Sequence, residues 1–196
     1  LLPRYESLRP RLLRDRARAD GLLVSTEAQM SKGDIVDWPP GERDGFVFRP
    51  VNTVVNAFHL RSLTLVAELA EALGKHAEAR EHRDRERVAR RAFQEKLFDP
   101  VRELYRDGEG TEHASLHANL FPLAFGLVPT PARKGVVEWV ARRGMACSVY
   151  AAQYLLEALF EHGEDRRALA LLTAPTDRSW RHMLDSGATI MGPEVQ

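Results

Sequence analysis

The stretch VNTVVNAFHLRSLTLVAELAEALGKHAEAREHRDRERVARRAFQEKLF, residues 51–98, decides the fold class. Residues 51–73 carry apolar side chains on more than one stripe, so a helix there is buried on more than one side. Gly74 ends that helix, and residues 76–98 leave only a thin apolar line through charged positions. An inner helix followed across a tight turn by an outer helix is a helical hairpin.

The same order of helices recurs along the chain, with almost no strand expected. Two further pairs of inner and outer helices are expected over residues 115–126 and 131–143, then over 149–162 and 165–173. Pro131 opens the second outer helix in its first turn, and Ser148 caps the third inner helix. With a leading helix over residues 2–19, we predict one all-α domain over residues 1–196. Its architecture is either an open α-solenoid or part of a closed α/α toroid.

The composition fits an ordinary globular domain of 196 residues, with 44% hydrophobic and 29% charged residues. Lys plus Arg equals Asp plus Glu at 28 each, so no overall field favours nucleic acid or an anionic membrane. No apolar run reaches the roughly 18 residues of a membrane span. The single cysteine, Cys147, excludes an internal disulfide and a cysteine-based zinc site. The compartment stays open between cytoplasmic and exported.

A polar loop over residues 33–56 precedes the first hairpin, and its prolines at positions 39, 40 and 50 keep it from being helical before position 51. Trp38 stands in it beside several carboxylates, which include Asp37, Glu42 and Asp44. Sugar sites are commonly built this way, because apolar sugar faces stack on rings while hydroxyls bond to charged acceptors. The alternative is a loop whose aromatic rings pin two helices together.

Two other places carry side chains capable of chemistry. His113 and His117 are four residues apart, a spacing that can hold a metal, but no glutamate follows the first histidine and a third ligand is missing. We therefore predict no metal there, and favour sugar contacts or helix capping. Asp177 is expected to cap a helix that starts at Ser179, with Trp180 packed beneath it. Glycine-rich phosphate loops are absent, which argues against a nucleotide cofactor.

Six segments resemble, in order, the catalytic domain of bacterial α-L-rhamnosidases of glycoside hydrolase family seventy-eight. They are GDIVDWP (33–39), ERDGFVF (42–48), VNTVVNAFH (51–59), HASLHANLFPLAFGLVP (113–129), GMACSVY (144–150) and TDRSW (176–180). The likeness covers nearly the whole chain. It implies an (α/α)6 toroid and inverting hydrolysis of terminal α-L-rhamnosides with no organic cofactor. Inversion needs a carboxylic acid and a carboxylate about 6.5 to 9.5 Å apart.

The resemblance also implies where the substrate binds. The residues that it places around the sugar are Asp37, Trp38, His117 and Trp180, with Glu42 and Asp44 close by and His113 as a further contact.

The resemblance is incomplete at both catalytic positions. The family's general-acid segment normally precedes the Asp-Trp block, and we expect this chain to start too late to contain it; Glu42 is the alternative acid. After residues 187–190, Glu194 is the candidate for the general base, one position beyond its expected place and without the neighbouring tryptophan. We therefore expect a fragment of a longer catalytic domain, weak or inactive alone. Self-association is plausible through an open inner wall.

A second hypothesis comes from a different class of protein. In it, the chain is an α-helical repeat module that binds a protein partner and has no catalytic activity. The two hypotheses differ in geometry, since a sugar site requires the candidate residues to converge at one end of the helices.

Overall fold

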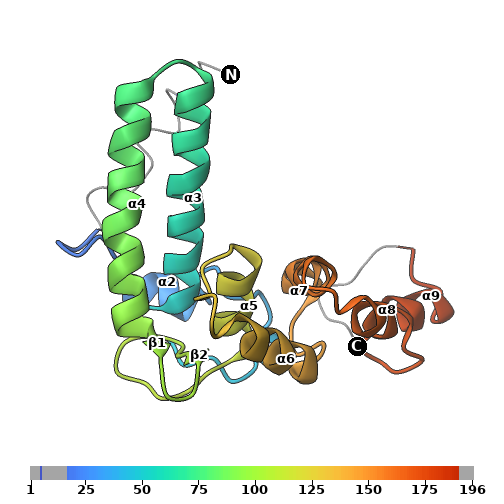
Figure 1. The fold of residues 1–196 in the computed structure, drawn as a ribbon. Helices are drawn as coiled ribbons and strands as arrows, with labels where there is room; N and C mark the ends of the chain where they lie inside the picture. The colour runs from blue at the N-terminus through green and yellow to red at the C-terminus, as the bar shows by residue number, and fades with distance from the viewer. Residues whose placement is uncertain (1–4, 6–16, 190–196) are drawn as a thin grey trace.

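The computed structural model describes Tyr5 and residues 17–189, which are mostly helical, as predicted (Figure 1). The longest helices, α3 (Thr53–Ala72) and α4 (His76–Leu97), form the hairpin that opens the domain. The other elements are α2 (Glu27–Ser31), the 3-10 helix η3 (Pro40–Glu42), β1 (Phe98–Asp99), β2 (Leu104–Tyr105), α5 (Leu116–Ala124), α6 (Arg133–Arg143), α7 (Val149–Glu161), α8 (Asp165–Thr173) and α9 (Trp180–Asp185). No helix in this part of the chain is long and apolar enough to cross a membrane.

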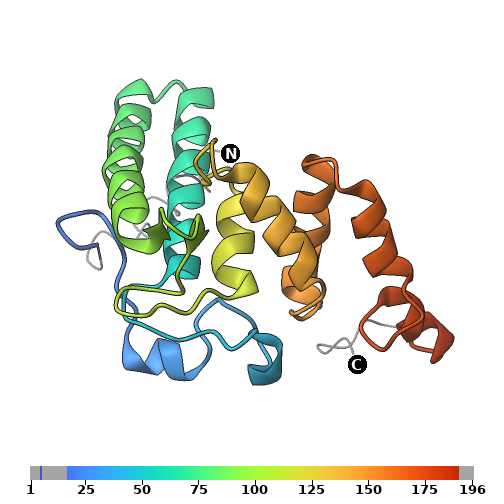
Figure 2. The ribbon, with the colours of Figure 1, turned by 60° about the horizontal axis from the view of Figure 1, so that its bottom comes forward.

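The helices form an inner and an outer layer. α5 packs against both α3 and α7, while α4, α6 and α8 each pack against the inner helix that precedes them. Figure 2 shows the resulting curved row of helices. α5 is buried from Leu116 through Leu123, whereas α4 buries one line of side chains that includes Ala89 and Phe93. This difference follows from the sequence, because only the inner helices are apolar on several stripes.

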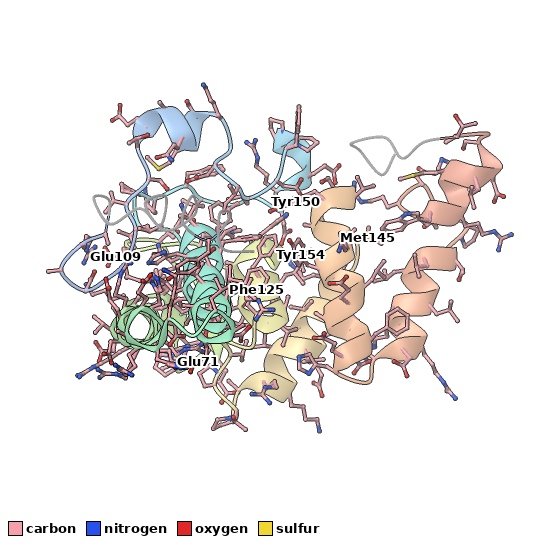
Figure 3. All side chains as sticks on the ribbon, turned by 90° about the horizontal axis from the view of Figure 1, so that it is seen from above. Glu71, Glu109, Phe125, Met145, Tyr150 and Tyr154 are labelled. Carbon is pink, nitrogen blue, oxygen red and sulfur yellow. The ribbon has the colours of Figure 1, made fainter. Side chains whose placement is uncertain are left out.

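An aromatic cluster joins the inner helices. The ring of Phe58 on α3 lies 4.8 Å from that of Phe121 on α5, measured between centroids. Tyr154 on α7 lies 5.7 Å from Phe125 and 6.0 Å from Tyr150 (Figure 3). Such tilted and edge-on pairs add about 0.5–1.5 kcal/mol each beyond the area they bury. The cluster therefore fixes where the first turn of α7, which carries Tyr150, lies relative to α5.

Each inner helix begins with a side-chain cap at the same end of the domain. Asn52, Ser115 and Ser148 accept hydrogen bonds from the backbone N–H groups of Val55, Ala118 and Tyr150 at 2.9, 3.2 and 3.2 Å. The cap at Ser148 confirms the prediction from the sequence. The loop that carries η3 passes across this end of the domain (Figure 2).

The structure corrects several local expectations. α2 was not expected, although Thr26 and Gln29 form a capping box that signals a helix start. η3 contradicts the expectation of no helix before Pro50, because Pro40 fits the first position of a helical turn. Two further differences are that α6 begins after Pro131 and that Ser179 rather than Asp177 caps α9. The helix expected over residues 2–19 lies mostly outside the described residues and stays a prediction.

Candidate functional site

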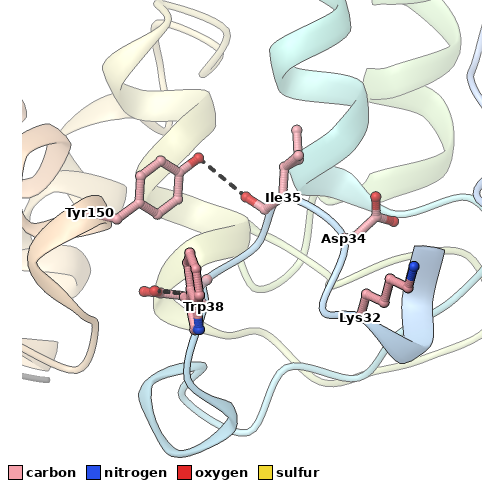
Figure 4. Close-up of a pocket in the computed structure, with 6 residues that line it drawn as sticks. Lys32, Asp34, Ile35, Trp38 and Tyr150 are labelled. Atoms are coloured by element: carbon pink, nitrogen blue, oxygen red, sulfur yellow. Dashed lines mark hydrogen bonds between the residues drawn. The ribbon is translucent and has the colours of Figure 1, made fainter. Parts of the chain in front are cut away.

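A cavity of about 510 Å³ opens where the loop meets the N-terminal end of α7 (Figure 4). Its lining residues are Lys32, Asp34, Ile35, Asp37, Trp38 and Tyr150. One wall is the loop with Trp38, whose surface is 83% exposed, and the other is Tyr150. Small-molecule sites in proteins have about this volume and combine apolar rings with a few polar groups.

The exposed indole is carried by a fixed backbone. The N–H of Trp38 donates to Asp37 Oδ1 at 2.8 Å, and Arg43 Nη2 donates to the Trp38 carbonyl at 2.8 Å. Arg43 Nε also donates to the Asp37 carbonyl at 3.0 Å. Gly33, with a φ of +88°, makes room for Arg43, since a Cβ there would lie 2.1 Å from Nη2. A large apolar ring held exposed at a fixed position is suited to contact a ligand.

The buried carboxylate of Asp37 ties the loop to two helices. It accepts from His117 Nε2 at 2.9 Å, from the Ser148 N–H at 3.0 Å and from the Ser148 hydroxyl. Burial acts to raise the pKa of Asp37, but these hydrogen bonds outweigh it and hold the pKa below its ordinary value. Ser148 bonds to the aspartate and not to the histidine, so the three residues do not form a nucleophilic triad.

His117 is fully buried beside Asp37. Because a carboxylate only accepts, the ring proton lies on Nε2, and the buried Nδ1 has no hydrogen-bond partner among the described residues. Neither side chain reaches the surface in this structure, so both act on the cavity through the backbone that they hold. Their expected roles as sugar contacts stay predictions.

Glu42 and Asp44 are both held in ion pairs. Arg178 donates to both carboxylate oxygens of Glu42, the bond from Nη1 to Oε1 being 3.1 Å long. Asp44 accepts from the Leu116 N–H at 2.6 Å and from Arg143 Nη2 at 2.8 Å. Fork-shaped guanidinium contacts of this kind fix geometry as well as charge. Both carboxylates therefore fasten the loop to other segments.

The remaining candidates lie apart from the Asp37 cluster or outside the described residues. His113 Nδ1 contacts Asp107 Oδ2 at 2.6 Å in a second cluster. Trp180 is the first residue of α9 and packs, partly buried, against the main core. Glu194 falls outside the described residues. The structure thus brings Asp37, Trp38 and His117 together.

Sequence reasoning missed Tyr150 and Asp107. The Tyr150 hydroxyl donates to the Ile35 carbonyl at 3.2 Å, which joins the two walls of the cavity (Figure 4). Burial, with the nearby Tyr154 and Asp37, raises the pKa of Tyr150, so the phenol stays protonated. Tyr150 ends one of the six family-like segments, which was the available signal. Asp107 lies next to Gly108 in a loop, and no sequence motif marked it as the partner of His113.

Metal chemistry and thiol chemistry find little support in the part of the chain that the structure describes. No group of three His, Cys, Asp or Glu side chains there could hold a metal ion. Burial, followed by the nearby charge of Asp37, raises the pKa of the Cys147 thiol, so Cys147 stays protonated and unreactive.

Comparisons with solved structures show the fold. A rhamnosidase from Klebsiella oxytoca with rhamnose bound is 20% identical, with a TM-score of 0.73; the match covers 94% of this chain and 34% of that protein. A GH78 family rhamnosidase of Bacillus sp. GL1 is 19% identical, with a TM-score of 0.77; the match covers 94% of this chain and 19% of that protein. Streptomyces avermitilis α-L-rhamnosidase complexed with L-rhamnose is 22% identical, with a TM-score of 0.74; the match covers 100% of this chain and 17% of that protein. The chain thus spans between 17% and 34% of the length of these proteins.

The family assignment rests on a match of sequence. No curated protein matches the chain. The model of the bacterial alpha-L-rhamnosidase 6 hairpin glycosidase domain matches residues 4–192, which is nearly the whole chain. The paired inner and outer helices of the structure are consistent with the helical hairpins that this description names. The chain therefore belongs to the family of bacterial α-L-rhamnosidase six-hairpin glycosidase domains.

Proposed function

We propose that this domain binds the rhamnose of terminal α-L-rhamnosides between Trp38 and Tyr150 and takes part in their hydrolysis with inversion. The observation that carries the proposal is the exposed indole of Trp38, on a backbone held by Asp37 and Arg43, beside a cavity in a domain of the rhamnosidase family. Two solved relatives have rhamnose in their structures. Convergence of Asp37, Trp38 and His117 at one end of the helices supports this reading over a helical-repeat interaction module.

The lining of the cavity suits a deoxy sugar. Rhamnose has an apolar methyl group, which can pack against Ile35, and a ring face that can stack on Trp38. Asp34 Oδ2 accepts from Ser25 and Asn52, while Oδ1 has no partner among the described residues and can accept a sugar hydroxyl. The phenol oxygen of Tyr150 can accept another.

The acid and base of an inverting glycosidase must be free to exchange protons. Asp37 is buried, ionised and bonded to several donors, and Glu42 is occupied by Arg178. We therefore assign to Asp37 and Glu42 a positioning role. Glu194 stays our candidate for the general base, and we assign no general acid among the described residues.

Titration with L-rhamnose tests the binding step. We expect calorimetry to show that L-rhamnose binds to the protein. W38A should raise the Kd for L-rhamnose about tenfold or more, because a central aromatic contact is lost. W139F, which changes a tryptophan outside the cavity lining, is the matched control and should leave the Kd unchanged. Equal binding of D-glucose and L-rhamnose would contradict the proposed substrate class.

The stereochemistry is tested on an aryl α-L-rhamnoside. Any sugar that the protein releases should appear first as the β-anomer in proton NMR, even where turnover is weak, because an inverting displacement requires it. Release of the α-anomer first would contradict inversion while leaving the rhamnose site intact.

A further inference from the structure

The guanidinium of Arg178, which lies outside the cavity lining, contacts both of the segments that carry the walls of the cavity. Arg178 lies between α8 and α9, 136 residues from Glu42 in the chain. Its Nη groups donate to the Glu42 carboxylate, which follows Trp38 by four residues at the end of η3. Its Nε donates to the Met145 carbonyl at 2.8 Å, and Nη2 also donates to the Cys147 carbonyl at 3.3 Å.

The turn that Arg178 contacts leads directly into the second wall. Cys147 precedes Ser148, whose N–H and hydroxyl both donate to Asp37, and Tyr150 follows two residues later. The turn is thus fastened by Asp37 on one side and by Arg178 on the other.

Arg178 joins a different part of the loop from the bonds that link the two walls directly. The bonds between Ser148 and Asp37 and between Tyr150 and Ile35 join the walls near residues 35–37. η3 lies beyond these bonds and is joined to the turn before α7 through Glu42 and Arg178. The Glu42 side chain is only 10% exposed, so water competes weakly for it. A planar guanidinium can bond to a carboxylate and two carbonyls at once, which the ammonium of a lysine cannot match.

We propose that Arg178 is a positioning residue that sets the separation between Trp38 and Tyr150, and thereby the affinity of the cavity. The inference rests on the proposed function for its ligand. It gives the segment between α8 and α9 a role in binding without contact with the sugar. Arg178 acts through Glu42 on the Trp38 side and through Cys147 on the Tyr150 side.

Two readouts test this role. The Kd for L-rhamnose is measured by calorimetry for the wild type, R178Q, R178K, E42Q and the double variant R178Q/E42Q. We expect each single variant to raise the Kd about tenfold and the double variant to raise it no further, because both changes break one link. Independently of any ligand, the fluorescence anisotropy of Trp38 is measured in a W139F/W180F background. R178Q should lower that anisotropy, since η3 loses its link to the turn before α7 and the segment that carries Trp38 becomes more mobile.

The matched control is R106Q. It breaks the ion pair between Arg106 and Asp99, which are 3.0 Å apart with side-chain exposures of 27% and 8%, outside the cavity lining. We expect R106Q to lose stability like R178Q while keeping the Kd within about twofold of the wild type. Equal effects of R106Q and R178Q on both readouts would overturn the proposal, as would an unchanged Kd in R178K.

The two proposals fail in different ways. If the wild type does not bind L-rhamnose, the proposed function fails, and the fluorescence anisotropy of Trp38 alone then decides the role of Arg178. An anisotropy that falls in R178Q but not in R106Q sustains that role. Equal anisotropy in the wild type and R178Q refutes it.

Discussion

Two buried aspartates hold the N-terminal ends of inner helices, and each is paired with a histidine. Asp37 accepts from His117 Nε2 at 2.9 Å, and Asp107 Oδ2 lies 2.6 Å from His113 Nδ1. Each aspartate side chain is wholly buried. The two clusters therefore share one construction.

The likeness extends to the helix caps. Asp37 accepts from the N–H of Ser148, the cap of α7, at 3.0 Å, and Asp107 accepts from the N–H of Ser115, the cap of α5, at 2.9 Å. In both cases a carboxylate satisfies a buried backbone donor that would otherwise be unpaired. This shared part is structural.

The clusters differ in what surrounds them. Asp37 is followed by the exposed Trp38 and borders the cavity, whereas Asp107 accepts from the backbone N–H of Val47 and lines none of the cavities described above. A buried Asp–His pair in this fold therefore organises helix ends. The proposed binding of a sugar depends instead on exposed groups beside the first pair, such as the indole of Trp38.

Replacing either aspartate by alanine should give the largest loss of stability. D37A leaves the buried donors of His117 and Ser148 without an acceptor, and D107A does the same to Ser115 and Val47. We expect each to lower the free energy of unfolding by about 3 to 5 kcal/mol, measured by urea unfolding.

Ligand binding then separates the two variants. In conditions where both are folded, D37A should abolish calorimetric binding of L-rhamnose, and D107A should keep the wild-type Kd. Equal loss of binding in both would break the comparison.

The buried His59, which contacts no carboxylate in the part of the chain that the structure describes, extends the comparison to the pH dependence of stability. Burial, with the charge of Arg85, lowers the pKa of His59 from 6.5 to about 4 in the folded protein. Between pH 6.5 and 4 the unfolded chain therefore binds a proton that the native state does not, and stability falls as the pH falls. The loss should reach about 3 kcal/mol at pH 4.

Urea unfolding at several pH values measures this effect. H59Q should flatten the dependence between pH 6.5 and 4, whereas H113Q, which alters a partly exposed histidine, should retain it. A wild-type stability that stays constant over this range would contradict the prediction.

Replacing a glycine near each cluster by alanine should give the next largest loss of stability. A Cβ on Gly33 would meet the guanidinium of Arg43 at 2.1 Å, and one on Gly108 would meet the Val51 carbonyl at 2.6 Å. We expect G33A and G108A each to cost about 1 to 3 kcal/mol by thermal or urea unfolding. Only G33A should change the fluorescence of Trp38, since Arg43 holds that backbone. G41A, with open space around it, is the control in the same loop.

The smallest expected change in stability comes from replacing Trp38, the residue proposed to contact the sugar. Because Trp38 is 83% exposed, W38A should shift the free energy of unfolding by no more than about 0.5 kcal/mol. W180A should cost more, since Trp180 packs against the core. A large destabilisation by W38A would mean that the indole is structural.

Local sequence predicted the helices well, for reasons that lie within a few residues of each position. The boundaries of α3 at Thr53–Ala72 and α8 at Asp165–Thr173 agree with the expected ranges to within two residues. Apolar periodicity, the glycine at position 74 and the cap at Ser148 are all local signals. Where two local caps competed, at Asp177 and Ser179, the pattern gave the wrong one.

The amino-acid sequence by itself determined the all-α hairpins, the polar loop around Trp38 and the likeness to the rhamnosidase family. Only the tertiary structure decided which charged groups meet. Asp37 finds Ser148 at a distance of 111 residues in the chain, and Glu42 finds Arg178 at 136. Such pairings depend on how helices pack, because the energy that joins the two groups exists only after the chain between them has folded.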